Sequence, residues 1–518
     1  MPLADDTPGG NGPDALLEAT DLDRFRQALN DFTVDGVADR LGLRGRAALE
    51  RGDVTGAARE LRAAADDPVA DLTSLFLLGE DVDVSRAARA LAPLPLGTAV
   101  EGGLLAGTPD GGSVRAAVEV RPYAEAVEGA TDWWVVSDLG SDVRPGPLAA
   151  DHVLGIGSAS LTLAQATPRL PVGRALDVGT GCGVQALHLD RHAHSVTATD
   201  LSPRALRFAA TTAALSGRSW DLRRGSLLEP VAGERFDLVV ANPPFVVSGG
   251  GAGFDYRDSG LAGDAVCETL LRGLPDVLAD DGCAVLLANW VVRDGEDWSD
   301  RLGSWVAGHG CDVWAWQREV AGPDEYVSLW LRDAGYRPGT ADWTGRYDAW
   351  CAWFESSGVA AVGMGLVALW RTGQHPVLAF DDVRQAIEQP VGGEVHDWAV
   401  RARWLRDTDD DRLLAAVLTP APDLVRSRGD LLGDGGWRTA AQQLRQSHGL
   451  RWEIEVDDAV AALVAGCAAG APLATCIDLL SLTLDATPAE IATAVLPTVR
   501  DLVARGFLLP PGSSGPVT

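Results

Sequence analysis

The sequence predicts an α/β protein built around a doubly wound, mostly parallel sheet, and two observations lead to this prediction. An apolar strand over 174–178 runs into a glycine-rich turn and then a helix, which is the unit that opens such a sheet. A second apolar strand over 236–241 ends in an Asn-Pro-Pro-Phe turn. Because ligands bind beyond the carboxyl ends of parallel strands, the two turns also mark the expected site.

The chain length of 518 residues is more than one hydrophobic core fills, so we expect several domains. The pattern is helical from about 21 to 92, and glycine-rich turns separate apolar runs between 98 and 136. We therefore predict an N-terminal module of helices and a small β extension over 1–149, an α/β domain over 150–333, and a mainly helical C-terminal module over 334–518. The last helices of the chain resemble a winged-helix bundle.

The glycine-rich turn after the first strand is the first candidate for ligand binding. Its glycines let the main chain approach a ligand closely. The dinucleotide fingerprint requires a third glycine where this chain has Val184, so the spacing disfavours NAD and FAD. The residues that we expect to contact a ligand here are Asp177, Gly179, Thr180, Gly181 and Gly183.

The next predicted strand, over 195–200, ends in a carboxylate. Acidic residues at this place in nucleotide-binding folds accept hydrogen bonds from ribose hydroxyls, and we expect the same of Asp200. Ser202 and Pro203 then begin a helix, as an N-cap and a first-turn proline. A third strand ends near Gly225, and a fourth, over 236–241, leads to Asn242.

The Asn242-Pro243-Pro244-Phe245 turn suits a flat, conjugated amino group. The Asn side-chain oxygen and the following main-chain carbonyl can accept the two N–H bonds of such an amine. Two prolines make the turn rigid and remove main-chain donors, so the turn presents acceptors alone. Phe245 offers an aromatic face for stacking.

The order Asp177, glycine-rich turn, Asp200, Gly225, Asn242, with each at the end of a predicted strand, resembles the S-adenosylmethionine-dependent methyltransferases. The resemblance covers about 150–333 and is closest to the amino-methylating branch with an Asn-Pro-Pro-aromatic turn. That branch includes adenine N6, guanine N2 and release-factor glutamine N5 methyltransferases. The resemblance implies a seven-stranded Rossmann-like sheet and S-adenosyl-L-methionine as the cofactor.

The resemblance also implies roles for individual residues. Many relatives carry Asp where this chain has Ser226, at the expected adenine contact. Relatives close the segment that corresponds to 152–163 over the methionine end of the cofactor. In this chain the segment either does the same or is only an N-cap and turn. The implied cofactor-binding residues are Asp177, Gly179, Thr180, Gly181, Gly183, Asp200, Leu201, Ser226, Leu227 and Asn242. The implied catalytic residues are Asn242, Pro243 and Phe245, and the implied substrate-binding residues are Pro244, Tyr256, Arg257 and Asp258.

Elements after the turn are predicted from composition and periodicity. The glycine-rich stretch 248–260 is either a mobile substrate lid or a surface connection. We expect a helix over 261–279, a strand over 283–290, and an antiparallel pair over 311–319 and 325–332 that completes the sheet. A Trp-rich helix over 343–353, a strand-like run over 359–370 and helices near 456–468, 473–483 and 487–505 follow. We interpret the Trp residues as packing rather than as a base-stacking platform.

Charge and cysteine content make several classes of protein less favoured without excluding a nucleic-acid substrate. A net charge of −30 makes the chain a poor indiscriminate binder of nucleic acid, because that affinity depends on neutralised phosphates. The seven Cys show no spacing typical of a metal site and suit reduced thiols. We therefore expect no metal, no membrane association and a cytoplasmic location.

The sequence-based interpretation is an N-methyltransferase for a conjugated amine. We favour, narrowly, a nucleobase amine in RNA or DNA, because Phe245 suits stacking and two extra modules suit a macromolecular substrate. Glutamine N5 methylation of a protein is the nearest alternative, and the acidity favours it. A small-molecule acceptor and a non-catalytic, cofactor-binding regulator remain as further alternatives.

Overall fold

The computed structural model describes residues 13–62, 66–124, 132–249, 262–373, 375–484 and 486–512. The chain divides into two compact units. Unit 1 comprises 1–163, 171–309 and 319–367, and unit 2 comprises 164–170, 310–318 and 368–518. The three domain ranges predicted above remain a proposal.

Unit 1 begins with a helical region followed by short strands, as the sequence predicts. Thr33 caps the second helix, where its Oγ1 accepts a hydrogen bond from the Gly36 N–H (2.9 Å). The helices are α1 (Ala19–Ala28), α2 (Val34–Glu50), α3 (Val54–Leu61), α4 (Pro68–Phe76), α5 (Val84–Ala90) and α6 (Leu96–Glu101). The strands are β1 (Val82–Asp83), β2 (Leu105–Gly107), β3 (Ser113–Ala116), β4 (Glu119–Tyr123) and β5 (Trp133–Ser137). The first three pair in the order β1-β3-β2, and β4 pairs with β5.

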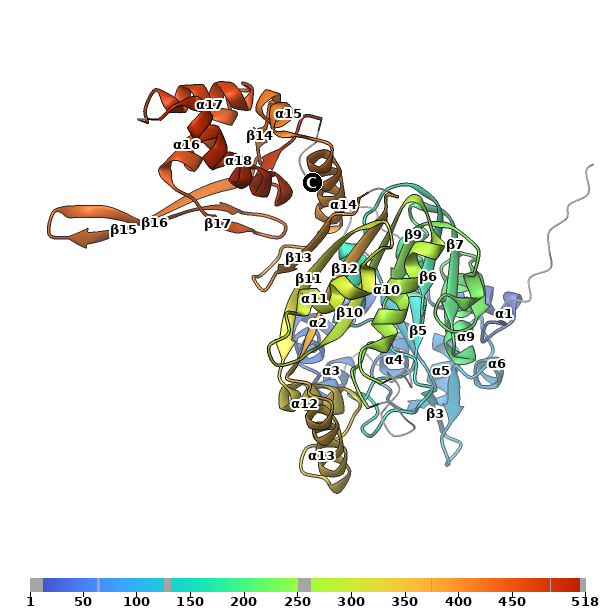
Figure 1. Cartoon of the computed structure of the whole chain (residues 1–518). Helices are drawn as coiled ribbons and strands as arrows, with labels where there is room; N and C mark the ends of the chain where they lie inside the picture. Colours follow the sequence, from blue (N-terminus) through green and yellow to red (C-terminus); the bar gives the residue numbers. More distant parts are fainter. Residues whose placement is uncertain are drawn as a thin grey trace, which may run out of the picture. The chain divides into compact units, whose positions relative to one another are not determined.

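The largest sheet carries the predicted turns. Its strands are β6 (Val172–Val178), β7 (Ala193–Asp200), β8 (Asp221–Arg224), β9 (Phe236–Ala241), β10 (Leu278–Val292), β11 (Cys311–Ala321), β12 (Ala361–Arg371) and β13 (Leu378–Asp382). The associated helices are α7 (Ser158–Ala166), α8 (Val184–Leu189), α9 (Pro203–Leu215), η1 (Glu229–Val231), α10 (Ala265–Val277), α11 (Trp298–Val306), α12 (Pro323–Asp333) and α13 (Ala341–Ser356). Figure 1 shows α10 and α11 across one face of the strands.

The strand order β13-β11-β12-β10-β9-β6-β7-β8 contains a switch point at β6. From β6 the chain proceeds to β7 and β8 on one side, and it then returns to β9 on the other side. The pairs β6–β7, β7–β8, β6–β9 and β9–β10 are parallel. Residues 175–178 of β6 are all buried, as expected for a central parallel strand covered on both faces. The crevice beside a switch point is where such sheets bind ligands.

The structure corrects two expectations about the far side of the sheet. The sheet has eight strands instead of seven, because β13 pairs parallel to β11. Residues 325–332 form part of helix α12 and not a strand, so the predicted pairing of 311–319 with 325–332 is wrong. Strand β12, over 361–371, lies between β10 and β11 instead. It is formed by the apolar run that follows the Trp-rich helix.

Unit 2 contains the remaining helices and a long hairpin. The helices are α14 (Gly392–Arg406), α15 (Asp410–Ala415), α16 (Asp458–Cys467), α17 (Leu473–Ser481) and α18 (Pro488–Ala504), and the last three confirm the predicted helices. Strands β14 (Thr419–Pro420) and β18 (Leu508–Leu509) pair, and β15 (Leu424–Gly433), β16 (Gly436–Gln446) and β17 (Glu453–Glu455) form a meander. The β15–β16 hairpin extends as an arm in Figure 1. The winged-helix arrangement is not confirmed.

Candidate cofactor and acceptor site

The register of the sheet brings three predicted residues to one edge. Val178, the last residue of β6, has Thr199 as its register partner on β7 and Ala241 as its partner on β9. The residues that follow these three positions are Gly179, Asp200 and Asn242. Parallel pairing therefore places the glycine-rich turn between the carboxylate of β7 and the Asn of the Asn-Pro-Pro-Phe turn.

The glycine-rich turn has a main chain that side chains would strain. Gly179, Gly181 and Gly183 have φ angles of 72°, 55° and 83°, which is the left-handed region. A Cβ at Gly183 would lie 2.7 Å from the Trp220 ring, so only glycine fits there. A Cβ placed at Gly179 or Gly181 would have no group of the other described residues within 4 Å, apart from its chain neighbours. Their main chain is therefore open to close approach by a ligand.

Asp177 is a buried carboxylate with one oxygen in use. Its Oδ2 accepts hydrogen bonds from Thr180 Oγ1 (2.7 Å) and the Ala186 N–H (3.2 Å). Its Oδ1 is buried and has no hydrogen-bond partner among the residues that the structure describes. Burial, with a smaller contribution from the charge of Asp200, raises the pKa of Asp177 to about 7. A buried acceptor of this kind is suited to a cationic ligand group.

Asp200 lies at the end of β7 and accepts two main-chain hydrogen bonds. Oδ2 accepts from the Gly181 N–H (2.9 Å) and Oδ1 from the Ser202 N–H (2.8 Å). Burial raises the pKa of Asp200 in spite of these hydrogen bonds, which favour the ionised form. Since each carboxylate oxygen can accept more than one hydrogen bond, Asp200 keeps capacity for hydroxyl donors.

The third segment with predicted cofactor contacts lies at the end of β8. The Gly225 N–H donates to the Asp200 main-chain oxygen (3.1 Å), which holds the end of β8 against the end of β7. Leu227 has a φ of 48°, and its carbonyl accepts from Thr199 Oγ1 (3.3 Å). Ser226 is half-buried, and the side chain of Leu201 is 65% exposed. Ser226, Leu227 and Leu201 thus lie at the same strand ends as Asp200 and the glycine-rich turn, and their contact with a cofactor stays a prediction.

Asn242 directly follows β9 and contacts helix α7. Its Nδ2 donates to Ser160 Oγ over 3.5 Å, and Gln185 Nε2 donates to the Ser160 main-chain oxygen (2.7 Å). Helix α7 begins at Ser158, inside the approach segment that the sequence singles out. Ser160 thus connects this segment with both helix α8, which follows the glycine-rich turn, and the Asn-Pro-Pro-Phe turn. The sequence analysis did not single out Gln185. The only sign of its role was its polar side chain in a buried helix.

Of the remaining turn residues, Phe245 contacts helix α12. Pro243 is buried, whereas Pro244 and Phe245 are half-buried. The Phe245 ring lies 6.1 Å from the Trp330 ring at an interplanar angle of 68°. The sequence analysis did not identify Trp330 as a neighbour of Phe245, because it predicted a strand over 325–332. The predicted substrate residues Tyr256, Arg257 and Asp258 lie outside the described residues.

The residues at these strand ends fit S-adenosylmethionine. The free Oδ1 of Asp177 and the charge of Asp200 suit a ligand that carries a positive sulfonium and an ammonium group. The open main chain at Gly179 and Gly181 permits close contact, and Asp200 can accept from ribose hydroxyls. In the part of the chain that the structure describes, no three His, Cys, Asp or Glu side chains gather as a metal site would require.

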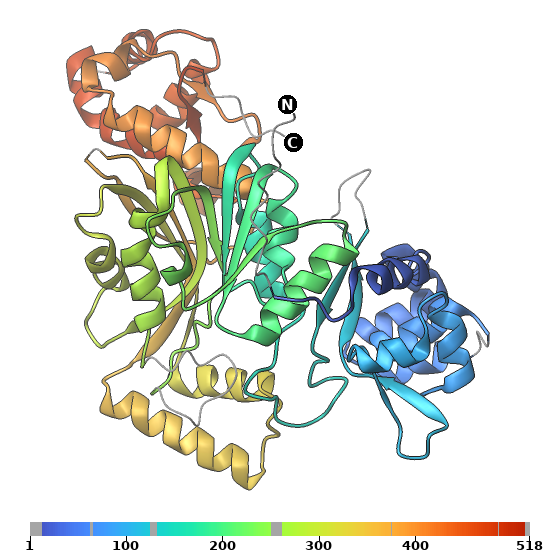
Figure 2. The same ribbon diagram turned by 90° about the vertical axis from the view of Figure 1, so that its right-hand side faces the viewer.

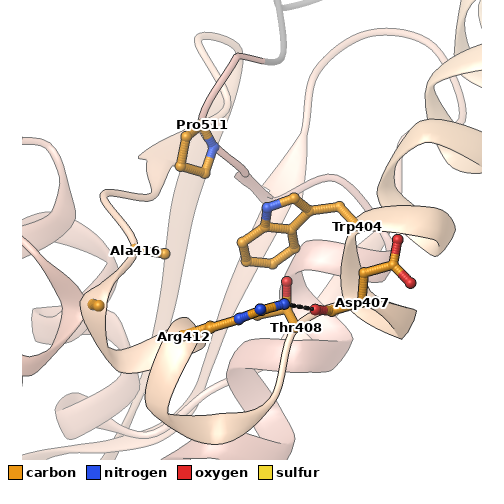
Figure 3. A pocket seen from close by; sticks show the side chains of 7 residues that line it. Trp404, Asp407, Thr408, Arg412, Ala416 and Pro511 are labelled. Atoms are coloured by element: carbon orange, nitrogen blue, oxygen red, sulfur yellow. Dashed lines mark hydrogen bonds between the residues drawn. The ribbon is translucent and has the colours of Figure 1, made fainter.

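Two further features of the described residues lie outside this site. Among the described residues, no helix is long and apolar enough to cross a membrane. An open pocket of about 460 Å³ in unit 2 places the Trp404 ring beside the Arg412 guanidinium, which donates to the Asp407 carbonyl (2.8 Å; Figure 3). The pocket is lined by Trp404, Asp407, Thr408, Arg412, Ala415, Ala416 and Pro511 and contains none of the predicted site residues.

Three family models match parts of the chain, and one of them spans the strand ends described above. Residues 151–289 match the family described as methyltransferase small domain. Residues 29–117 and 396–510 match two families described as domains of unknown function, DUF7059 and DUF7782 respectively.

The curated relatives include enzymes named as methyltransferases of protein glutamine and of ribosomal RNA. A release factor glutamine methyltransferase of Xylella fastidiosa is 32% identical over 195 residues, which is 34% of this chain and 68% of the relative. One from Deinococcus radiodurans is 49% identical over 80 residues, 15% of this chain and 28% of the relative. Ribosomal RNA small subunit methyltransferase C of Enterobacter is 33% identical over 147 residues, 28% of this chain and 39% of the relative. The chain thus spans less than half the length of several curated relatives.

Solved structures match about two fifths of the chain. Ribosomal protein L11 methylase from Lactobacillus delbrueckii subsp. bulgaricus has a TM-score of 0.25 and 20% identity, covering 42% of this chain and 81% of that one. Haemonchus contortus phosphoethanolamine N-methyltransferase 2 in complex with S-adenosyl-L-methionine has a TM-score of 0.26 and 13% identity, covering 41% and 52%. The family match at 151–289 and the longer match to the Xylella relative both indicate a methyltransferase. The chain belongs to the S-adenosylmethionine-dependent methyltransferases of the amino-methylating kind.

Proposed function

We propose that this protein transfers a methyl group to a conjugated amino nitrogen. The observation that carries the proposal is the position of Asn242 at the switch point, next in register to the glycine-rich turn and followed by Pro243, Pro244 and Phe245. Asn242 therefore stands where a cofactor and an acceptor can meet.

When bound, S-adenosylmethionine supplies a methyl group on a positively charged sulfur, and transfer forms the nitrogen–carbon bond as the sulfur–carbon bond breaks. The chain's own part is binding and alignment. Asn242 Nδ2 donates to Ser160, so the Asn242 amide oxygen is the atom left for the acceptor amine. The Pro243 carbonyl accepts the second N–H, and Phe245 stacks on the conjugated system.

These contacts address the weak nucleophilicity of such an amine. Its lone pair is delocalised, and two acceptors that hold both N–H bonds draw the nitrogen toward tetrahedral geometry. After transfer the nitrogen is positively charged and acidic, so its proton passes to water without a strong base. The prolines cannot donate a main-chain hydrogen bond, which keeps the turn free of donors that would compete with the amine.

A nucleobase amine remains our preferred acceptor, because the half-buried Phe245 offers an aromatic face beside the turn. Protein glutamine is the second candidate. A net charge of −30 and the similarity to glutamine methyltransferases favour it. In both cases the substrate is a macromolecule, and the regions outside 151–289 would contribute to docking it.

Labelling distinguishes these acceptors. Purified protein and tritium-labelled S-adenosylmethionine are incubated with a bacterial lysate, which is then divided among RNase, DNase and protease. We expect label that RNase or DNase releases. Label released by protease alone would replace the nucleobase with glutamine. The Asn242→Ala variant is the matched control, since label that it also transfers comes from another enzyme.

A further inference from the structure

Helices α12 and α13 form an insertion between β11 and β12, and they pack on the segment that follows the acceptor turn. Figures 1 and 2 show the two helices as a pair at one end of the sheet. Their core cluster includes Val246 and Val247 together with Tyr326, Trp350 and Phe354. Residues far apart in the sequence thus share one buried cluster next to Phe245.

Val247 has both of its main-chain groups bound by side chains of this insertion. Its N–H donates to the Tyr326 hydroxyl of α12 (2.9 Å), and its carbonyl accepts from Trp350 Nε1 of α13 (3.0 Å). Val247 and Tyr326 are completely buried and Trp350 is 2% exposed. Residue 247 belongs to no strand, so without these partners its buried peptide groups would lack hydrogen bonds at a substantial free-energy cost.

The insertion also lies close to the residues two positions before and two positions after Val247. Phe245 contacts Trp330, and a Cβ at Gly249 would lie 3.0 Å from the Trp353 ring. The Tyr326 hydroxyl also accepts a hydrogen bond from Asn289 Nδ2 of β10 (3.0 Å). The aromatic side chains of the insertion therefore follow residues 245, 247 and 249 and connect them to the sheet.

We propose that Tyr326 and Trp350 are positioning residues that hold the Val247 peptide and thereby orient Phe245 and the Pro243 carbonyl toward the acceptor. This proposal rests on the proposed function. Packing alone does not account for the arrangement, because Phe would fill the same volume as Tyr326 without a hydroxyl in the core. The hydroxyl is needed because two buried N–H groups, from the main chain and from Asn289, donate to it.

The matched variants are Tyr326→Phe and Trp350→Phe, with Tyr347→Phe and Trp305→Phe as controls. Tyr347 lies on the same hairpin and stacks on Trp343, and Trp305 is a buried indole of α11. Hydrogen–deuterium exchange with S-adenosylhomocysteine present is measured first. We expect the peptide that covers 243–249 to exchange about tenfold or more faster in the two test variants and unchanged in the controls.

Methyl transfer is then measured with tritium-labelled S-adenosylmethionine and total bacterial RNA or DNA, or total protein where the wild type labels protein. We expect kcat to fall at least tenfold in Tyr326→Phe, while the Kd for S-adenosylhomocysteine stays within about twofold. Wild-type kcat in Tyr326→Phe and Trp350→Phe would overturn the positioning role and leave the proposed function intact. An equal loss of cofactor affinity would also overturn it, since the variants would then be generally disrupted. A wild type that labels none of the RNA, DNA and protein fractions would overturn the proposed function itself.

Discussion

Asp200 accepts a hydrogen bond from the main-chain N–H of Gly181 over 2.9 Å, so the carboxylate of β7 holds the glycine-rich turn that follows β6. The same carboxylate caps the start of the next helix through the Ser202 N–H. Asp200 therefore shapes the glycine-rich turn as well as presenting acceptor oxygens, and we expect substitutions there to affect both the turn and ligand binding.

Asp200→Ala should weaken S-adenosylmethionine binding by roughly 10- to 150-fold, since charge-assisted hydrogen bonds contribute about 1.5–3 kcal/mol. Titration calorimetry measures this directly, with Asp221→Ala as the control because Asp221 is an exposed carboxylate on β8. Unchanged affinity in Asp200→Ala would remove the ribose assignment.

Asn242→Ala should lower the methyl-transfer rate by about 100-fold or more, as loss of one preorganised polar contact in a transition state does. Cofactor affinity should change far less than in Asp200→Ala. Ser160→Ala removes only the side-chain hydroxyl that Asn242 contacts, so its effect should be milder. Normal turnover by Asn242→Ala would contradict amine methylation as the reaction.

Asp177 should make the ligand-free protein less stable as the pH rises toward about 7. Burial raises its pKa from 3.8 to about 7, so the folded state binds this proton more tightly than the unfolded state. The resulting stabilisation is complete below about pH 4 and is lost as the pH passes through about 7; it amounts to at most about 4 kcal/mol. Asp177→Asn should therefore melt above the wild type at pH 8, and the difference should shrink at pH 5. Melting curves with a constant offset across this range would be inconsistent with a raised pKa.

The same carboxyl should couple cofactor binding to proton release. A cationic ligand group near the free Oδ1 favours the ionised form of Asp177 and lowers its pKa. Binding of S-adenosylmethionine near pH 6.5 should therefore release protons and tighten as the pH rises toward 8. Calorimetry in two buffers of different ionisation enthalpy measures the release, which Asp177→Asn should abolish. Equal proton release by wild type and variant would assign the effect to another group.

Salt dependence should identify the class of acceptor. On a chain with net charge −30, nucleic acid would have to dock on a local Arg surface. The methylation rate at sub-saturating RNA or DNA should then fall steeply with salt, because log affinity falls by about 0.7–0.9 per neutralised phosphate for each unit of log salt. A flat profile over a fourfold salt range, with label that resists nuclease, would favour glutamine.

Sequence reasoning predicted which residues the structure brings together at the ends of β6, β7 and β9, because local signals mark these strand ends. Gly179, Gly181 and Gly183 have positive φ angles, which the choice of glycine at these positions already indicates. Asp177 and Asp200 lie at the ends of apolar runs. The failures lie on the other side of the sheet. A window over 325–332 contains apolar residues at spacings that suit either a strand or a helix, and only packing on Val247 and Phe354 makes it helix α12.

The sequence by itself determined the order of the strand–turn–helix units from β6 to β9 and the residues at their ends, since short-range periodicity and turn chemistry specify them. The tertiary structure alone decided that β12 lies between β10 and β11 and that β13 adds an eighth strand, because strand neighbours depend on pairing between distant segments. It likewise decided that Tyr326 and Trp350 bind the two peptide groups of Val247, 79 and 103 residues away along the chain. No local pattern encodes such a contact, since it arises from buried polar groups that find partners only when the core closes.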